Sequence, residues 1–388
     1  MKTNTYTRAL GFLIVMGLLL VGNNNPTLAQ MPALPDTDSD IYYGHEYGVS
    51  GIAEALLRFE MNFPPSKISD QVTNSVELAL NYVWDNRFQL NGSQVGSWAK
   101  GPEQQSIYPG KKYGAAGIIP AFLDMYNVTK STQWLDRAIS SYWQLSEEAL
   151  NGSDFPNWPY SYFEPHDDGI SLTDLKYGST GILSIGIDLY SLTGNQSYLE
   201  HGLLITQWLD TVSVELQVEN QQYRVLPWYN LDGTPGPIKT GYEWGIAGVA
   251  PIIYKLGDLV NSDKLKQWGL ELGQFLVSIQ NSDGSWNTEY NGKIGLTGFD
   301  EGVAGVVFGL NELQLLSGSN NFDQSIISAV NFLYSHYSDQ LSLTSFNVAA
   351  ESETVYNGLN RGLLGVLKSL VSVQDLLTSE QTDIIIST

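Results

Sequence analysis

Three carboxylates at two related places in the chain could carry chemistry. Glu243 lies two residues before Gly245, and Asp300 and Glu301 fill the two positions before Gly302. Neighbouring carboxylates can share general acid and base roles, and they can also bind a hard cation such as calcium. At a helix start they would instead cap free N–H groups and complement the helix dipole. We treat Glu243 and Asp300 as a candidate catalytic pair that Glu301 tunes by like charge, and the calcium and capping alternatives stay open.

These carboxylates belong to an internal repeat. A Gly-x-x-Gly motif followed by an aliphatic residue recurs along the chain, and its first glycines are Gly48, Gly114, Gly178, Gly245, Gly302 and Gly362. Successive motifs are 57 to 67 residues apart. Near-constant spacing of this kind is the signature of a repeat architecture.

Each motif opens a segment with helical periodicity. The apolar positions after Gly248 follow the helical spacing, at Val249, Ile252, Ile253, Leu256 and Leu259. A short polar turn follows each such segment, for example at 192–195 and 316–319. The second helix of the fourth repeat has the apolar positions Leu265, Trp268, Leu272, Phe275 and Leu276. The repeating unit is therefore a helical hairpin.

Six hairpins predict an all-α fold, an (α/α)6 toroid with an inner and an outer ring of helices. The motif glycines would open the inner helices and let these crowded helices approach closely. We expect one toroid domain over residues 45–388, because no linker divides it. Two domains of three hairpins each are the alternative.

Long loops lead into the motifs and predict where function lies. The loops 91–112, 152–176, 217–243 and 281–300 are rich in aromatic residues, glycine and proline, and long loops carry function more often than short ones. We expect the residues before the motifs to line the central mouth. The candidates for substrate binding are His45, Glu46, Tyr47, Lys112, Tyr113, Lys176, Tyr177, Trp244 and Arg361.

These candidates combine aromatic rings with charges of both signs. Tyr177, Trp244 and the loop residue Trp158 could serve as platforms for sugar rings. The cationic residues could grip an anionic group on a substrate or pair with nearby glutamates. Helices that pack roughly 8–10 Å apart would hold Glu243 and Asp300 roughly 5–10 Å from each other, which covers the carboxylate separations of glycoside hydrolases.

The repeated glycine motif and the segment 280–286 (QNSDGSW) resemble those of the lanthionine synthetase C-like family. The resemblance spans the mature chain and implies an (α/α) barrel. Members of that family use a zinc ion to activate a peptide thiol. Where the family has two cysteine ligands, the strings 241–245 (GYEWG) and 298–302 (GFDEG) have Glu243 and Asp300, and Glu301 replaces the histidine. Three carboxylates argue against zinc and leave calcium or no metal.

Composition and the N-terminus predict an exported protein. Lys2 and Arg8 precede and flank an apolar run at 9–21, and small residues before position 30 suit cleavage after Ala29. We expect a signal peptide at 1–29 and a linker at 30–44; an uncleaved anchor is the alternative. With 41 acidic and 19 basic residues, the chain is unsuited to nucleic acid or anionic membranes. It has no cysteine, which excludes disulfides and thiolate chemistry.

Together these features predict an exported or secreted toroid that binds or modifies a peptide or a carbohydrate in its central mouth, without a cofactor. One alternative is a glycoside-hydrolase-like enzyme that uses Glu243 and Asp300 as acid and base. The other is a non-catalytic module that binds a glycan or a peptide.

Overall fold

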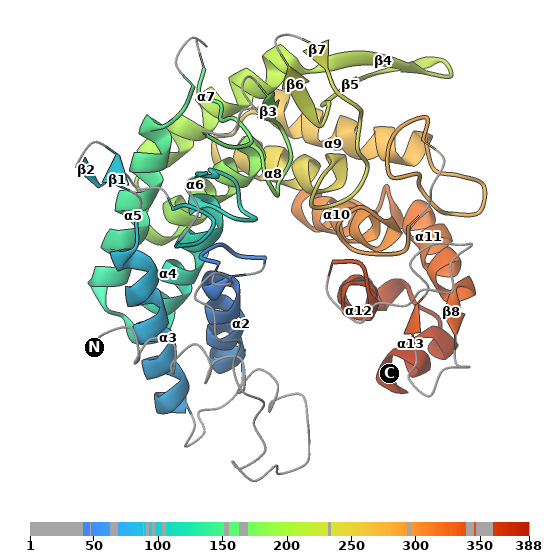
Figure 1. The fold of residues 1–388 in the computed structure, drawn as a ribbon. Coiled ribbons are helices and arrows are strands. Elements are labelled where there is room, and N and C mark those ends of the chain that lie inside the picture. Colours follow the sequence, from blue (N-terminus) through green and yellow to red (C-terminus); the bar gives the residue numbers. More distant parts are fainter. Residues whose placement is uncertain are drawn as a thin grey trace. The chain divides into compact units, whose positions relative to one another are not determined.

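The computed structural model describes residues 42–46, 48–62, 69–87, 89–90, 93–94, 98–102, 106–150, 155–162, 170–231, 234–292, 296–338, 345–346 and 360–387 (Figure 1). The predicted signal segment, most of the predicted linker and the candidate residue Tyr47 lie outside these ranges. No helix within them has the length and apolar character needed to cross a bilayer.

The chain divides into two compact units. The first comprises Met1–Gly152 and Trp158–Asp168, and the second Ser153–Asn157 and Gly169–Thr388. The elements of the first are α2 (Val49–Asn62), α3 (Ser69–Asp85), β1 (Gln89–Leu90), β2 (Ser93–Gln94), α4 (Ala115–Thr129) and α5 (Thr132–Glu147). Here α2 packs against α3 and α4, and α4 packs against α5.

The second unit continues the hairpin pattern. Its helices are α6 (Ser179–Thr193), α7 (Ser197–Val212), α8 (Ile246–Leu259), α9 (Asp263–Ser278), α10 (Val303–Ser317), α11 (Asp323–Ser335), α12 (Leu363–Ser372), η3 (Gln374–Leu376) and α13 (Ser379–Ser387). Helix α8 packs against both α6 and α10, and α10 packs against α12. The helices that follow the glycine motifs are thus neighbours, as expected of an inner layer, and the all-α prediction is confirmed.

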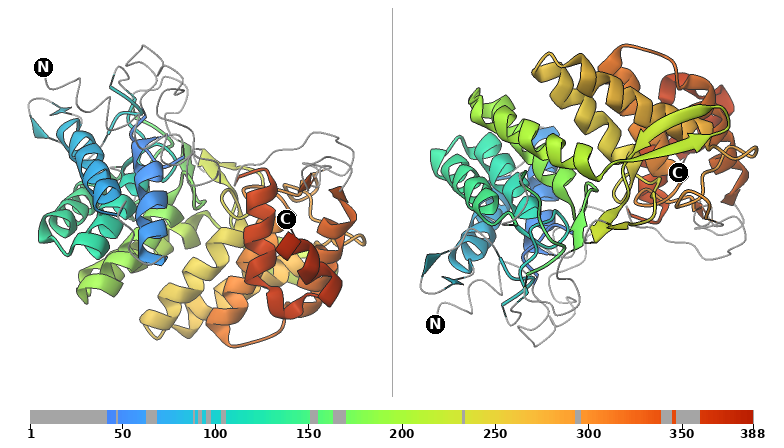
Figure 2. Two further views of the ribbon diagram at one scale, coloured as in Figure 1. Left: turned by 90° about the horizontal axis from the view of Figure 1, so that it is seen from below. Right: turned by 90° about the horizontal axis from the view of Figure 1, so that it is seen from above.

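Short antiparallel strands occupy the loops of this unit. They are β3 (Ile170–Leu172), β4 (Val214–Val218), β5 (Gln221–Val225), β6 (Tyr229–Leu231), β7 (Thr234–Pro235), β8 (Tyr337–Ser338) and β9 (Ser345–Phe346). β6 pairs with both β3 and β7, and β4 pairs with β5 in a hairpin that Figure 2 shows as a long ribbon. These strands were not predicted, because the repeat pattern of the sequence is helical.

The glycine motif places the start of each inner helix. Gly245 and Gly302 are N-cap residues with extended backbone. The first-turn N–H groups donate to carbonyl groups seven residues earlier: that of Ile246 to Lys239 (3.0 Å) and that of Val303 to Leu296 (2.8 Å). The segment before each helix therefore folds back and caps the helix with its own backbone, which satisfies groups that otherwise need a side chain or water.

The second glycine of the motif is required by this fold-back. A Cβ atom on Gly248 would lie 1.9 Å from the carbonyl oxygen of Tyr242, and one on Gly305 would lie 1.9 Å from that of Phe299. Our explanation that these glycines let inner helices approach one another is therefore wrong at these positions. The close neighbour is the preceding loop, and the same contact recurs at Gly117.

Buried tryptophans close the C-terminal ends of three outer helices. The indole N–H groups of Trp98, Trp158 and Trp286 each donate to a helix carbonyl at 2.7 Å, in α3, α5 and α9 respectively. All three side chains are fully buried. The prediction of Trp158 as a sugar platform is therefore wrong, because its ring serves as a helix cap inside the core.

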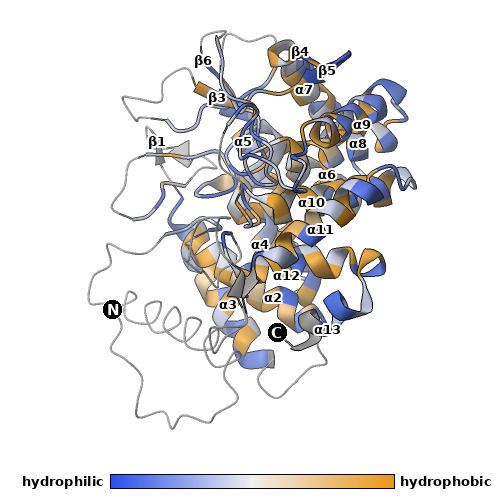
Figure 3. Ribbon diagram, turned by 90° about the vertical axis from the view of Figure 1, so that its right-hand side faces the viewer, coloured by the Kyte–Doolittle hydropathy of each residue, from blue (hydrophilic) through white to orange (hydrophobic). Residues whose placement is uncertain are grey.

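The predicted hairpin turns and apolar faces are present. α6 ends at Gly194 and α10 at Gly318, both with left-handed backbone. The predicted apolar positions of α9 are all buried. In Figure 3 the helices carry both apolar (orange) and polar (blue) segments, as amphipathic helices should.

Candidate functional site

One motif position, two residues before the first glycine, is joined between repeats by backbone hydrogen bonds. In the second unit the N–H of Lys176 donates to the carbonyl oxygen of Glu243 (3.0 Å), that of Glu243 to Asp300 (3.0 Å), and that of Asp300 to Asn360 (2.9 Å). The structure thus brings the two candidate catalytic residues together, because equivalent turns of successive repeats pair edge to edge.

Asp300 has a buried partner. The Nζ atom of Lys176 lies 2.5 Å from its Oδ2 atom, and the two side chains are only 5% and 6% exposed. The Lys176 side chain thus pairs with Asp300, two repeats further along the chain. Its backbone N–H, in contrast, donates to Glu243 of the repeat between them. An oxygen that already accepts from an ammonium group is not available to give a proton to a substrate.

Glu301 is also paired. An Nη atom of Arg361 lies 3.4 Å from its Oε1 atom, and the arginine side chain is 59% exposed. An exposed pair at this distance contributes little stability. Arg361 therefore neutralises Glu301 without fixing it firmly.

The structure does not gather the three carboxylates into one cluster of metal ligands. No group of three or more His, Asp or Glu residues that could hold a metal is found in the described part of the chain. The donor set does not fit zinc either, because the chain has no cysteine and Oδ2 of Asp300 contacts an ammonium group. We therefore derive no step through zinc.

Backbone carbonyls, rather than these carboxylates, accept the first hydrogen bonds of α8 and α10. Neither Gly245 nor Gly302 is accompanied by a side-chain cap. Loop carbonyls accept the hydrogen bonds of the first turns of α8 and α10 instead. Glu243, Asp300 and Glu301 are therefore left for other contacts.

Glu243 lies beside an aromatic cluster. The next residue, Trp244, stacks on Trp228 with ring centres 5.6 Å apart and an angle of 9° between the planes. Tyr177 meets Trp244 edge-on at 5.6 Å. Glu243 and both tryptophans are partly exposed, whereas Tyr177 is buried. Within the described ranges, no hydrogen bond or ion pair of the Glu243 carboxylate is found.

Asp174 positions this cluster, and it was not among the predicted site residues. Its Oδ1 atom accepts from the N–H of Tyr177 and its Oδ2 atom from the indole N–H of Trp228, both at 2.6 Å. Burial raises the pKa of Asp174 to about 7, and the nearby Glu243 charge adds to the shift. A signal was present, because the other repeats have glycine at this position, as at Gly241.

The candidates of the first unit are engaged with neighbouring side chains. His45 Nε2 lies 3.3 Å from Glu54 Oε2, and Lys112 Nζ lies 3.1 Å from Glu46 Oε2. The Lys112 ammonium also lies 4.9 Å from the centre of the Tyr113 ring. The expectation that a motif lysine pairs with a glutamate is confirmed for Lys112 and Glu46. Because these charged groups already contact one another, they are less suited to binding a charged substrate group than Glu243 is.

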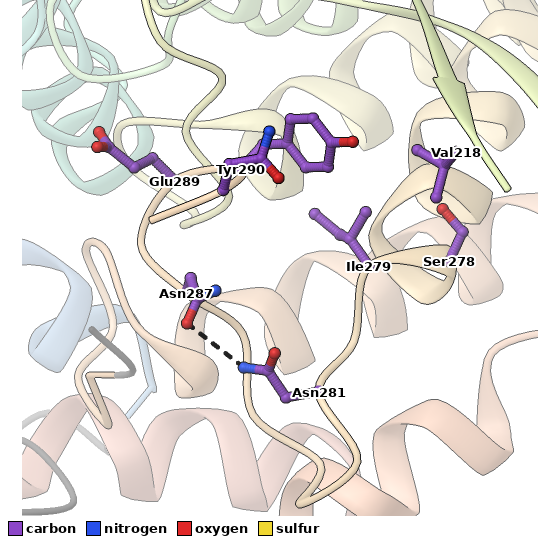
Figure 4. Close-up of a pocket in the computed structure, with 8 residues that line it drawn as sticks. Val218, Ser278, Ile279, Asn281, Asn287, Glu289 and Tyr290 are labelled. Carbon is purple, nitrogen blue, oxygen red and sulfur yellow. Dashed lines mark hydrogen bonds between the residues drawn. The ribbon is translucent and has the colours of Figure 1, made fainter. Parts of the chain in front are cut away.

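The second unit also contains a pocket of about 270 Å³ in the loop that follows α9 (Figure 4). Its lining is mainly polar and consists of Val218, Ser278, Ile279, Asn281, Asn287, Glu289, Tyr290 and Asn291. The amide of Asn281 donates to the side-chain oxygen of Asn287 at 3.5 Å, as Figure 4 shows. Most of the lining comes from a loop that the sequence predicted to carry function.

Comparison with solved structures supports the fold. No family model and no curated protein matches the chain. Nisin cyclase matches with a TM-score of 0.59 and 14% identity, over 99% of this chain and 85% of the cyclase. A sugar epimerase from a ruminal bacterium matches with a TM-score of 0.55 and 12% identity, over 81% of this chain and 85% of the epimerase.

A third similar structure is a family 76 glycoside hydrolase, a mannosidase from Bacteroides thetaiotaomicron. Its TM-score is 0.54 at 12% identity, and the match covers 96% of this chain and 98% of the mannosidase. At these identities the likeness shows the fold alone. The chain thus has the helical-hairpin fold of the (α/α) toroids, but the likeness extends to sugar enzymes and does not single out the lanthionine synthetase C-like family.

Proposed function

We propose that the second unit binds a carbohydrate against Trp244 and transfers a proton to or from it through Glu243. The observation that carries the proposal is the state of the motif carboxylates. Asp300 and Glu301 contact cations, whereas Glu243 has no such partner among the described residues and adjoins a partly exposed indole pair. A carboxylate without a counter-ion can act as a general base or acid.

The aromatic cluster suits a sugar ring. A sugar ring presents C–H groups on its faces and hydroxyl groups at its rim. Its face can therefore pack on a flat indole while a hydroxyl donates to a neighbouring carboxylate. Trp244 is held in place by Trp228 and Tyr177, and Asp174 fixes both of these. The buried indole N–H of Trp244 has no hydrogen-bond partner among the described residues. An unsatisfied buried donor is uncommon and costs about 1–3 kcal/mol, so the fold alone does not account for this side chain.

The role of Asp300 differs from our first hypothesis. Its buried pair with Lys176 holds the carboxylate against an ammonium group, which suits a positioning residue rather than a proton donor. Its backbone carbonyl accepts from the N–H of Glu243 and fixes the place of that residue. Glu243 is therefore the single acid/base residue of the proposal. Two of the similar structures are sugar enzymes, a sugar epimerase and a mannosidase, which agrees with this substrate class.

The test uses the purified chain and the variants Glu243→Gln and Trp244→Ala. Neutral mono- and oligosaccharides of mannose and glucose are offered, with binding measured by calorimetry and turnover by NMR; a cysteine-containing peptide is the alternative ligand. We expect Glu243→Gln to bind saccharide without turnover, Trp244→Ala to lose affinity, and Glu215→Gln, an exposed carboxylate on β4, to match the wild type. Turnover by Glu243→Gln would contradict the role of Glu243 as the acid/base residue. If the wild type binds saccharide without turning it over, the protein is a binding module. If it binds the peptide and no saccharide, the carbohydrate proposal is wrong.

A further inference from the structure

The pocket after α9 is linked to the aromatic cluster through one lysine. Lys239 Nζ lies 3.0 Å from Oε2 of the pocket residue Glu289 and 5.5 Å from the centre of the Trp228 ring. A single ammonium group therefore contacts the wall of the pocket and the tryptophan on which Trp244 stacks.

Backbone hydrogen bonds hold the same two regions together. The N–H of Thr240 donates to the carbonyl oxygen of Thr288 (3.1 Å), its hydroxyl donates to that of Asn287 (2.6 Å), and the N–H of Tyr290 donates to that of Ile238 (2.8 Å). The segment 238–240 leads directly into the turn that carries Glu243. The pocket wall and the proposed acid/base residue are thus attached to one continuous stretch of backbone.

The lining of the pocket suits hydroxyl groups. Asn281, Asn287 and Asn291 supply amides, which both donate and accept, and Ser278 and Tyr290 supply hydroxyls. A sugar hydroxyl also donates and accepts, so it can satisfy either kind of partner. The aliphatic side chains in the lining and the tyrosine ring offer apolar surface to the C–H groups of the same ligand.

The charge of the pocket favours a neutral ligand. Among its lining residues only Glu289 is charged, and Lys239 pairs with it. The chain as a whole carries a net charge of −22, which repels anions. At about 270 Å³ the pocket lies below the roughly 300–1,000 Å³ of sites for drug-sized ligands, so it has room for one ring rather than a chain of rings.

The wall of the pocket is held by contacts of its own. The N–H of Asn281 donates to the carbonyl oxygen of Ser285 (2.9 Å), and that of Gly284 donates back to Asn281 (2.9 Å). Gln280 Nε2 donates to the carbonyl oxygens of Gly284 and Ser325, both at 2.9 Å. A wall fixed before a ligand arrives lowers the entropy lost on binding.

We infer that this pocket is a second subsite, which holds one uncharged hexose-type unit of an oligosaccharide while a neighbouring unit lies against Trp244. The inference rests on the proposed function and deepens it, because it makes the substrate a chain of neutral sugars rather than a single sugar. Glu243 would then act on a unit beside the one held in the pocket.

The test compares ligand length in pocket variants of the full chain. Asn287→Ala and Tyr290→Ala remove an amide and an aromatic ring from the lining, and Tyr190→Ala is the control, a partly exposed tyrosine of α6 in the same unit. The ligands are mannose and mannotetraose, with glucose and cellotetraose as the second series, and calorimetry gives each affinity. Thermal unfolding checks that each variant is folded.

We expect wild type to bind the tetrasaccharide of one series at least tenfold more tightly than its monosaccharide. Each pocket variant should lose about tenfold in tetrasaccharide affinity, equivalent to about 1.4 kcal/mol, with monosaccharide affinity unchanged. Wild-type affinity of both folded variants for the tetrasaccharide overturns the subsite and leaves the proposed function standing. Absence of saccharide binding by wild type overturns the proposed function itself.

Discussion

Lys176 and Asp300 form a buried ion pair, with the ammonium nitrogen 2.5 Å from a carboxylate oxygen. The pair joins the third and fifth repeats, whereas the backbone N–H of Lys176 meets Glu243 of the fourth. A long side chain thus reaches past the adjacent turn, and the intervening glutamate is left without a described counter-ion.

We predict that Lys176→Met destabilises the second unit by about 3–5 kcal/mol, because it removes the ammonium group that pairs with the buried Asp300 carboxylate. The double variant Lys176→Met with Asp300→Leu should recover most of this loss, since removing both charges avoids their desolvation. Urea unfolding followed by tryptophan fluorescence measures the free energies. Equal stability of the single and double variants would contradict a coupled pair.

A second prediction concerns pH and Asp174. Burial raises its pKa to about 7 from the ordinary value of 3.8, so between these values the folded state binds more protons than the unfolded state. Its contribution to stability is therefore fully present below about pH 4, declines as the pH rises, and is lost above about pH 7.

The measurement is the free energy of unfolding of wild type and Asp174→Asn between pH 4 and pH 8. The difference, wild type minus variant, should fall as the pH rises to about 7 and then level off. Fluorescence of the native state gives a local signal, because Asp174 accepts from the Trp228 indole. The exposed Asp375→Asn serves as control; a pH-independent difference for Asp174→Asn would refute the assignment.

The glycine motif gives a third prediction. Gly248→Ala places a Cβ atom 1.9 Å from a backbone carbonyl oxygen, so the backbone of the turn must shift. We expect a loss above about 3 kcal/mol, at the upper end of overpacking effects. Gly194→Ala is the control, because its φ of 68° is unfavourable for alanine but nothing lies within 4 Å. Its loss should be about 1–2 kcal/mol. Similar losses at the two positions in thermal or urea unfolding would show that the contact is relieved easily.

The repeat explains how much of the architecture could be predicted. The spacing of Gly178, Gly245 and Gly302 marked the starts of α6, α8 and α10, because the fold-back contacts recur wherever the motif does. Turns such as the one at Gly194 were predictable for a different reason, because a left-handed backbone at the end of a helix favours glycine. Trp158 was misassigned, since a loop tryptophan that caps a helix has the same local sequence features as one that faces solvent.

The site was less predictable, because it depends on contacts between repeats. The motif position of Asp300 could be read from the sequence, but its pairing with Lys176 depends on how far a lysine reaches across turns. Asp174 departs from the glycine of the other repeats, and only the position of Trp228, 54 residues away, shows why. The pocket likewise depends on side chains of β4, α9 and the following loop, which no local pattern relates.

The tryptophan caps provide the last prediction. Trp286→Phe removes the indole N–H that donates to the carbonyl oxygen of Leu276 at 2.7 Å, and this acceptor then keeps only the longer hydrogen bond from the N–H of Ile279 at 3.3 Å. Trp208→Phe is the matched control, since Trp208 is 5% exposed and no hydrogen bond of its indole N–H is found in the described ranges. Both changes remove the same volume. We therefore expect Trp286→Phe to destabilise the protein by about 0.5–1.5 kcal/mol more than Trp208→Phe in urea unfolding, the net value of one hydrogen bond. An equal loss would mean that the ring volume, and not the hydrogen bond, accounts for the tryptophan at the end of α9.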